Sequence, residues 1–296
     1  MKKNIKSTLV AIGTAALSVA ALAADRIELN GAGGSFPAPL YQKWCYAYTQ
    51  SEQGAKVNYQ SVGSSAGISQ IKSGTIDFAG TDAPLSAEDC EKAGFVQFHM
   101  VSGAVVPAVN LPGVANGALV LDGETIADIY LGKITRWNDA RLAKLNPTLT
   151  LPDLKITVVH RGDGSGTTHI FTTYLSSVST EWKARFGAAT QLKWPCGIAG
   201  QKNPGVCNNV RRIKGAIGYT EYTFALESKL SVAHLAVNGK TAAPDAADWP
   251  ILGKTYILTR NDTPAEKKAA LQAYFDWCFA NGGETAKKLH YLPVAR

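Results

Sequence analysis

The sequence predicts an α/β protein with two domains. Length is the first reason, because the chain has 296 residues and a single domain usually accounts for about 100–200. The second reason is that strand-like runs repeatedly lead into helix-like runs through turns rich in glycine and serine. Composition agrees, since 46% of the residues are hydrophobic and can build sizeable cores.

Residues 1–23 have the features of a secretory signal peptide. A cationic start precedes an apolar run over residues 9–21, and Ala21-Leu22-Ala23 matches an A-x-A cleavage site. The run is too short to cross a bilayer, so we expect an exported protein with no direct membrane insertion. Without Lys2, Lys3 and Lys6 of the signal peptide the formal charge falls from +7 to about +4, a mild bias, and no basic run carries interleaved aromatics, so no nucleic-acid partner is expected.

Export would place all five cysteines in an oxidising compartment, where disulfides form. The best candidate pair is Cys196 with Cys207, because these residues bracket a Gly/Asn/Pro loop whose closure is worth about 3 kcal/mol. Cys45 with Cys90 is a second candidate pair, which leaves Cys278 as a buried thiol in an apolar helix. No spacing is typical of a zinc site, and neither a metal nor a cofactor is expected.

The first strand–turn–helix junction follows a short strand over residues 27–30. A turn rich in glycine and proline leads into an amphipathic helix over residues 40–50. A dinucleotide-binding fingerprint would need glycine at position 36, where this chain has Phe36. Ser35 and Phe36 can instead present a hydroxyl and a backbone N–H group to a ligand.

The second junction joins a strand over residues 56–62 to a helix over residues 68–72, and Ser64 and Ser65 lie at the helix N-terminus. The turn also matches G-x-S-x-G, the nucleophile elbow of serine hydrolases, with Ser65 as the nucleophile. Such an enzyme would need an acid and a histidine later in the chain, and no second motif supports the residues that could serve: Asp163 with His234 or His290.

A third strand, over residues 76–81, delivers Asp82 to a strand end, where open α/β sheets bind ligands. The alternative is that Asp82 caps a helix starting near Ser86. Two apolar strands are then expected at residues 96–101 and 103–109, with a crossing to the second domain between them.

The nine-residue turn over residues 160–168 is the motif most informative about function. Its alternating glycines leave main-chain N–H groups uncovered. Ser165, Gly166 and Thr167 lie where the first N–H groups of the following helix have no intrahelical partner. With the positive end of the helix dipole, these groups suit a tetrahedral oxyanion.

Two charged side chains belong to the same turn. Arg161 supplies a planar cationic fork for two oxygens, whereas Asp163 has the wrong sign for an anion ligand and is expected to orient the guanidinium. An ordinary turn with a helix cap is the alternative. The motif is not a P-loop, because no lysine follows its last glycine.

Five stretches of the chain resemble the periplasmic phosphate-binding proteins of high-affinity phosphate ABC transporters, the PstS family: GAGGSFPAPLYQKW, VNYQSVGSSAGISQIKSGTIDFAGTDAPLS, LVLDGETIADIYLGKITRWND, HRGDGSGTTHIFTTYL and KGAIGYTEYTFA. The resemblance implies a two-lobed, type II periplasmic binding protein. Residues 24–102 plus 251–296 would form lobe I and residues 103–250 lobe II, each a mixed sheet flanked by helices, with the ligand in the cleft. It also implies a periplasmic monomer, not an enzyme, that passes inorganic phosphate to a membrane permease.

Matching the motifs position by position places the family's phosphate ligands at eight residues of this sequence: Ser35, Phe36 (through its N–H), Ser64, Asp82, Arg161, Ser165, Gly166 and Thr167. Asp163 corresponds to the carboxylate that pairs with the arginine. The sequence departs from its relatives in a shorter segment over residues 228–249 and in its five cysteines, so the rim of lobe II is expected to differ.

Asp82 offers a way to tell phosphate from sulfate. Phosphate near neutral pH keeps a proton that it can donate to an ionised carboxylate, whereas sulfate has none. A site built around a substrate donor can reject the analogue lacking it by roughly 10⁴–10⁵. Two alternatives stay open: a secreted serine hydrolase using Ser65, and a phosphate scavenger of the same fold without a transporter.

Overall fold

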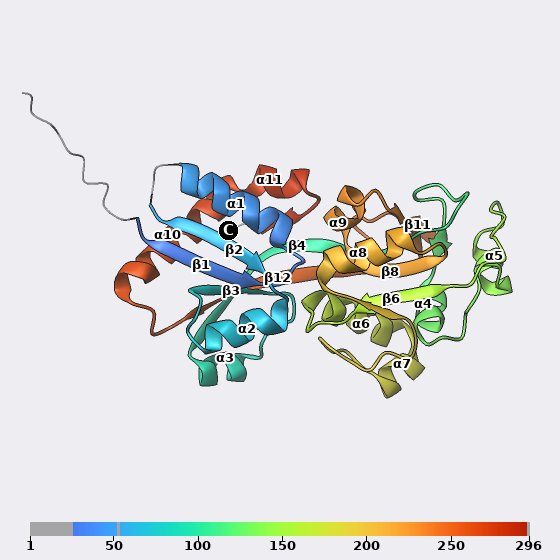
Figure 1. The fold of residues 1–296 in the computed structure, drawn as a ribbon, viewed down its shortest axis with the longest axis horizontal. Helices are drawn as coiled ribbons and strands as arrows, with labels where there is room; N and C mark the ends of the chain where they lie inside the picture. The colour runs from blue at the N-terminus through green and yellow to red at the C-terminus, as the bar shows by residue number, and fades with distance from the viewer. Residues whose placement is uncertain (1–25, 52–53, 295–296) are drawn as a thin grey trace, which may run out of the picture.

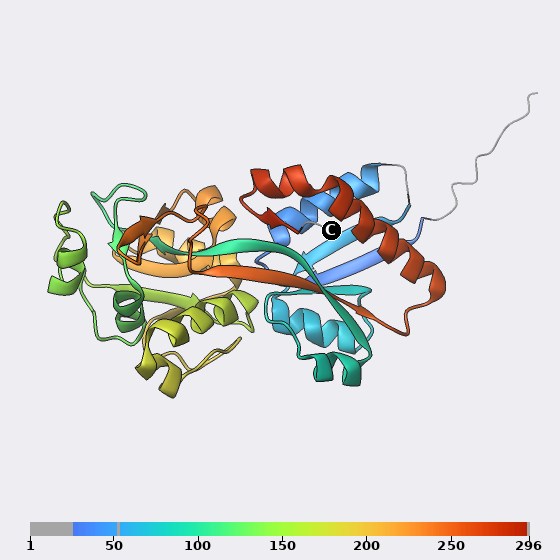
Figure 2. The same cartoon turned by 180° about the vertical axis from the view of Figure 1, so that it is seen from behind.

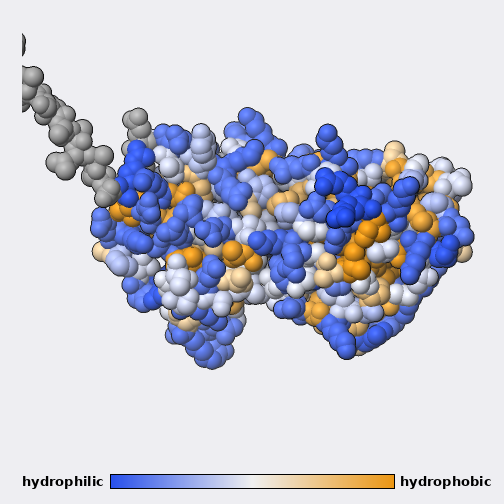
Figure 3. Space-filling view, viewed as in Figure 1, coloured by the Kyte–Doolittle hydropathy of each residue, from blue (hydrophilic) through white to orange (hydrophobic). Residues whose placement is uncertain are grey.

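The computed structural model describes residues 26–51 and 54–294. The predicted signal peptide, residues 1–23, lies outside the described residues. Two α/β bodies lie end to end and are joined by a pair of long strands (Figure 1). Figure 3 shows the same division as a notch in the molecular outline between the two bodies. Within the described part of the chain, no helix has both the length and the apolar character needed to cross a membrane.

Lobe I is built on three parallel strands that form one end of the main sheet: β2 (Lys56–Ser61), β1 (Glu28–Gly33) and β3 (Phe78–Thr81). One face of these strands is covered by α1 (Ala38–Gln50), α10 (Ala265–Asn281) and α11 (Gly283–Lys288). The other face is covered by α2 (Ser64–Lys72) and α3 (Ala87–Ala93), as Figures 1 and 2 show from opposite sides.

The lobes are joined by β4 (Phe95–Val109) and β12 (Leu252–Arg260), which pair antiparallel, and β13 (Leu292–Pro293) pairs with β4 beside the junction. The two apolar strands expected at residues 96–101 and 103–109 are in fact this single strand β4. Gly103 does not interrupt it. A side chain at Gly103 would meet the rings of Phe36 and Tyr291 at 3.0 Å, so packing favours glycine there.

Lobe II continues the same sheet with β8 (Ala216–Glu221), β6 (Thr157–Arg161) and β7 (Ile198–Gly200), which run parallel to one another. Around it lie α4 (Gly123–Tyr130), α5 (Ala140–Leu145), α6 (Gly166–Val178), α7 (Thr180–Arg185), α8 (Lys202–Arg212) and α9 (Tyr222–Glu227). The short strand β9 (Ser231–Val232) pairs with β4, and a separate small sheet holds β5 (Val120–Leu121), β10 (His234–Val237) and β11 (Lys240–Ala242). The mixed sheet with helices on both faces confirms the predicted fold class.

The core of lobe II fixes the position of the functional turn. Phe171 of α6 stacks on Tyr219 of β8 with ring centroids 4.4 Å apart, and Tyr130 packs edge-on against Phe171. The Tyr219 hydroxyl accepts a hydrogen bond from the backbone N–H of Arg161 at 3.0 Å and lies 2.6 Å from the Thr168 hydroxyl. Tyr219 therefore ties the end of β6 to the start of α6.

The predicted disulfides are wrong, because all five cysteines are free. The segment from Cys196 to Cys207 is not a loop but contains β7 and the first half of α8. Cys196 lies against the carbonyls of Ile129 and Tyr130, whereas Cys207 is buried in α8.

The second candidate pair is also absent. Cys45 contacts the Tyr274 hydroxyl at 3.2 Å in the main core, whereas Cys90 belongs to a separate, smaller cluster. The prediction that Cys278 is a buried thiol is confirmed.

Candidate ligand-binding site

The site forms where the carboxyl ends of the parallel strands of the two lobes meet. In lobe I, β1, β2 and β3 end at Gly33, Ser61 and Thr81, at one edge of their sheet. In lobe II, β6 and β7 end at Arg161 and Gly200. The eight predicted ligand residues lie at these strand ends, in the loops that follow them or in the first turn of the next helix, as expected for an open α/β sheet.

Lobe I contributes three buried polar side chains to the site. Ser35 and Ser64 are fully or almost fully buried, and Asp82 is only 2% exposed. Ser64 begins α2 directly after Gly63, whose φ of 97° lets the chain turn sharply into the helix and whose lack of a side chain leaves the helix start uncapped.

Asp82 has an unusual environment for a carboxylate. Its Oδ2 lies 3.4 Å from the Ser64 hydroxyl, which donates to it, while its Oδ1 is buried without a hydrogen-bond partner among the described residues. Burial raises the pKa of Asp82 to about 7, although Thr255, Arg161 and Ser64 each act to lower it. The alternative role as a helix cap is excluded, because Ser86 caps α3 by accepting from the N–H of Asp89.

Lobe II contributes the arginine fork. Arg161 is buried, and its Nε and Nη2 donate to the two carboxylate oxygens of Asp163 at 2.8 and 2.5 Å. Asp163 also accepts from the backbone N–H of Lys202. Burial by itself would raise the pKa of Asp163, but the hydrogen bonds and charge of Arg161 hold it below its usual value. The predicted pairing of these two residues is thus present, and it holds the guanidinium in one orientation.

The start of α6 reaches across to lobe I. The Gly166 N–H donates to the Ser64 hydroxyl oxygen at 3.1 Å, and the Ser65 N–H donates to the Gly164 carbonyl at 3.3 Å. The Ser165 hydroxyl oxygen accepts from the Thr168 N–H and caps α6. It therefore also has the helix-capping role that the sequence offered as the alternative to anion binding. A side chain at Gly166 would lie 2.5 Å from Cβ of Asp82, so only glycine permits this approach.

The structure brings Ser35, Ser64, Asp82, Arg161, Ser165, Gly166 and Thr167 into one hydrogen-bonded region. Phe36 follows Ser35, with its ring buried and its carbonyl accepting from the Tyr291 hydroxyl at 2.7 Å, so only its N–H is left to serve a ligand. The structure does not support the serine-hydrolase alternative, because neither candidate histidine contacts Ser65. Ser65 is exposed, His234 lies beside Gly117, and His290 packs against Tyr222.

Sequence reasoning missed Asn203, a fully buried residue in the first turn of α8. Asn203 donates to Ser35 through its backbone N–H at 3.2 Å and through Nδ2 at 3.1 Å. The available signal was another strand–turn–helix junction, Gly200-Gln201-Lys202-Asn203-Pro204, with proline in the first helical turn. Tyr219 and Thr255 were missed as well, and they carry no local signal because their roles arise from tertiary packing.

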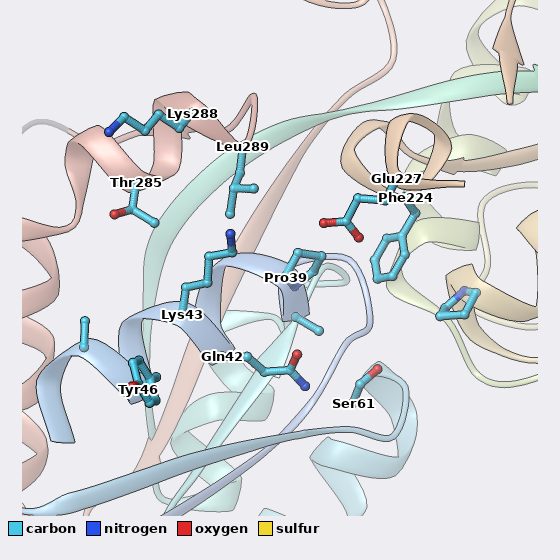
Figure 4. Close-up of a pocket in the computed structure, with 13 residues that line it drawn as sticks. Pro39, Gln42, Lys43, Tyr46, Ser61, Phe224, Glu227, Thr285, Lys288 and Leu289 are labelled. Carbon is cyan, nitrogen blue, oxygen red and sulfur yellow. The ribbon is translucent and has the colours of Figure 1, made fainter. Parts of the chain in front are cut away.

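Two cavities border the site. One, of about 840 Å³, is a groove between α1 and α11 on the lobe I side and α8 and α9 on the lobe II side (Figure 4). It contains none of the predicted ligand residues but is lined from both lobes, for example by Lys43 and Glu227. The other, of about 280 Å³, reaches Asp82 from the side of α6 and β12.

Comparison with known proteins assigns the chain to a family. A profile of the PBP superfamily domain matches residues 18–281. The chain is 43% identical to the phosphate-binding protein PstS of Xylella fastidiosa, over 90% of this chain and 82% of that protein. It is 40% identical to the phosphate-binding protein PstS of Haemophilus influenzae, over 90% of this chain and 89% of that protein.

A solved structure shares the fold. It is a putative phosphate ABC transporter substrate-binding protein with bound phosphate from Clostridium perfringens. The TM-score is 0.72 at 20% identity, over 90% of this chain and 99% of that one.

Proposed function

Because this chain belongs to the PBP superfamily and, within it, to the PstS phosphate-binding proteins, we propose that it binds inorganic phosphate between its lobes and delivers it to an ABC importer. The division into lobes proposed from the sequence puts one crossing, at residues 102–103, inside β4 and the other, at residues 250–251, just before β12. Export to the periplasm, a monomeric state and a membrane permease as partner are parts of the same proposal.

One observation supports phosphate above other anions: the Oδ1 of buried Asp82 has no hydrogen-bond partner in the described part of the chain. An ionised carboxylate can only accept, so it needs a ligand that brings a hydrogen. The groups near this carboxylate are the Gly166 N–H and the Ser64 hydroxyl, and the charge of the Arg161 guanidinium also acts on it. A tetrahedral anion with one remaining proton fits this arrangement, because its oxygens accept from the donors and its hydrogen is donated to Asp82.

The proposed ligands are the eight residues matched above, with Asp163 fixing Arg161 behind them. Backbone N–H groups and hydroxyls supply most of the hydrogen bonds, and Arg161 is held close to charge balance by Asp163. Such a site stabilises an oxyanion largely through dipoles and not through an excess positive charge. The ligand can therefore still be released when the lobes part.

Isothermal titration calorimetry with phosphate and sulfate tests the proposal. We expect phosphate to bind roughly 10⁴–10⁵-fold more tightly than sulfate, because a buried carboxylate repels an anion without a proton. Asp82→Asn should narrow this ratio, since its amide can donate to either anion. Equal affinity for the two anions in the unmodified protein, or no binding of phosphate, would refute the proposal.

Delivery to an importer needs a separate test. A strain lacking this gene should grow poorly on limiting phosphate and recover when the gene is restored. Normal growth of the deletion strain, together with tight phosphate binding in vitro, would favour a scavenger that works without a transporter.

A further inference from the structure

Asn203 connects the two lobes at the centre of the site without belonging to the proposed ligand set. It is fully buried at the start of α8 in lobe II. Its side chain reaches Ser35 of lobe I and Thr167 of lobe II, with Nδ2 lying 3.1 Å from the Ser35 Oγ and 3.4 Å from the Thr167 Oγ1. Both of these hydroxyls are proposed phosphate ligands.

The orientation of the Asn203 amide is fixed from behind. Its Oδ1 faces the backbone N–H of Glu221 at 3.4 Å and the Thr220 hydroxyl at 3.2 Å. A backbone N–H can only donate, so the atom facing it must be the amide oxygen. The Thr220 oxygen is within 3.5 Å of the Cys207 thiol, which donates to it and leaves the Thr220 hydrogen to point at Asn203. The amide NH₂ group must therefore face the site.

This orientation determines what Ser35 and Thr167 can do. Ser35 Oγ accepts twice from Asn203, through the backbone N–H and Nδ2. Thr167 Oγ1 accepts from Asn203 Nδ2 and from Nη1 of Arg161 at 3.3 Å. A hydroxyl has two acceptor positions and one hydrogen. With both acceptor positions used, each hydroxyl has only its hydrogen left to offer.

We propose that Asn203 is a positioning residue that makes Ser35 and Thr167 obligate hydrogen-bond donors toward the bound anion. A free hydroxyl can donate or accept, but a ligand rich in oxygens needs donors at every contact except the one where it gives up its own proton. Asn203 removes the choice at two of these contacts and leaves Asp82 as the acceptor. This inference rests on the proposed phosphate function, because it concerns the same site.

The variant Asn203→Asp tests the direction of these hydrogen bonds. It keeps the shape but replaces the NH₂ group by a second acceptor, to which the Ser35 and Thr167 hydroxyls would then donate. Turning a donor away from a charged ligand costs about tenfold or more in affinity for each hydroxyl. Asn203→Ala removes the amide without adding an acceptor, so it should weaken binding less than Asn203→Asp. A role in packing alone predicts the opposite order.

A double-mutant cycle with Ser35→Ala separates this effect from plain charge repulsion by the new carboxylate. In the unmodified protein, Ser35→Ala should weaken phosphate binding about tenfold, because a donor to a charged ligand is lost. In the Asn203→Asp background it should change affinity by less than about threefold, because that hydroxyl no longer faces the ligand. Charge repulsion would instead act equally in both backgrounds, and the two effects would multiply.

Asn146→Asp is the matched control, since Asn146 is a buried lobe II asparagine that bonds Val120 and Leu142 outside the site. It should leave phosphate affinity unchanged. Independent, multiplying effects of the Ser35 and Asn203 variants would overturn the inference while leaving the proposed function intact. Absence of phosphate binding by the unmodified protein would overturn both. If Asn203→Asp does not fold, Asn203→Ala decides, and phosphate affinity unchanged from that of the unmodified protein would overturn the inference.

Discussion

At the scale of single residues, the site depends on one carboxyl group held out of water. Asp82 lacks the arginine partner that keeps Asp163 ionised, and burial raises its pKa to about 7. A carboxyl with a raised pKa binds its proton more tightly in the folded protein than in the unfolded chain. Its contribution to stability is complete below pH 4 and is lost as the pH rises through about 7.

Asp82→Asn should therefore raise the melting temperature most at pH 8 and clearly less at pH 5, in buffer without phosphate. Each unit of pKa shift corresponds to about 1.4 kcal/mol, and roughly 2–4 °C accompany each kcal/mol in a chain of this size. Calorimetric unfolding of both proteins at the two pH values measures the difference. Burial also raises the pKa of Glu221 to about 8. Because both proteins contain Glu221, its contribution to the pH dependence of stability cancels in the comparison. Equal melting temperatures at pH 8 would contradict the burial argument.

At the scale of elements, the recurrent unit is a parallel strand that ends in a turn and starts a helix aimed at the cleft. The starts of α2 and α6 come within hydrogen-bonding distance of each other through Ser64 and Gly166. Backbone N–H groups at helix starts bind anions without any side chain, provided that the approach is unobstructed. Gly166 provides this clearance.

Gly166→Ala should weaken phosphate binding while the protein still folds. Its new methyl group would lie 2.5 Å from Cβ of Asp82 and 2.6 Å from the Ser64 hydroxyl oxygen, which opposes closure of the lobes. Overpacking of about 1–3 kcal/mol translates into roughly 5- to 150-fold in affinity. Gly283→Ala is the matched control, because nothing lies within 4 Å of the added carbon. Calorimetry should find the control unchanged; equal affinities for all three proteins would contradict the proposed closure.

The junctions explain how far sequence alone could predict the site. Three of them, at Ser35, Ser64 and Ser165, have glycine-rich turns that are visible in the sequence, and the structure places all three together. The fourth, at Asn203, was hidden because Cys196 and Cys207 suggested a disulfide loop in place of β7 and α8. Contacts such as Tyr219 with Arg161 span 58 residues, and no local pattern encodes them.

Strand β4, which joins the two lobes, is a second case that local sequence could not predict. We expected two strands, over residues 96–101 and 103–109, but β4 runs through both as one strand, and its glycine at position 103 makes room for the Phe36 and Tyr291 rings. Local sequence cannot tell a glycine needed for a turn from one needed for close packing.

At the scale of the whole molecule, the two lobes share one sheet. The order of its main strands is β2-β1-β3-β12-β4-β8-β6-β7, so lobe motion must bend or twist β4 and β12. The register between these strands shifts at Thr255 and Tyr256, beside the site, which gives β12 a natural point of bending. Between the described parts of the two lobes the hydrogen bonds are few, as at Gly166 with Ser64 and Asn203 with Ser35, so the ligand is expected to decide the balance between open and closed forms.

Phosphate should therefore make the protein more compact and more stable. Small-angle X-ray scattering should record a smaller radius of gyration with phosphate than without it, and no change with sulfate at the same ionic strength. Phosphate at about 1,000 times its dissociation constant should add about 4 kcal/mol to the free energy of unfolding. An identical radius with and without phosphate would contradict ligand-driven closure.

The direction of β1 has a practical consequence. Parallel strands place their amino ends at the edge opposite the site, and β1 begins at Glu28 near the outer tip of lobe I in Figure 1. A tether fused ahead of this strand would hold the protein to a solid support by the end remote from the opening. Immobilised in this way, the molecule could report dissolved phosphate through a dye whose surroundings change as the groove of Figure 4 widens or narrows.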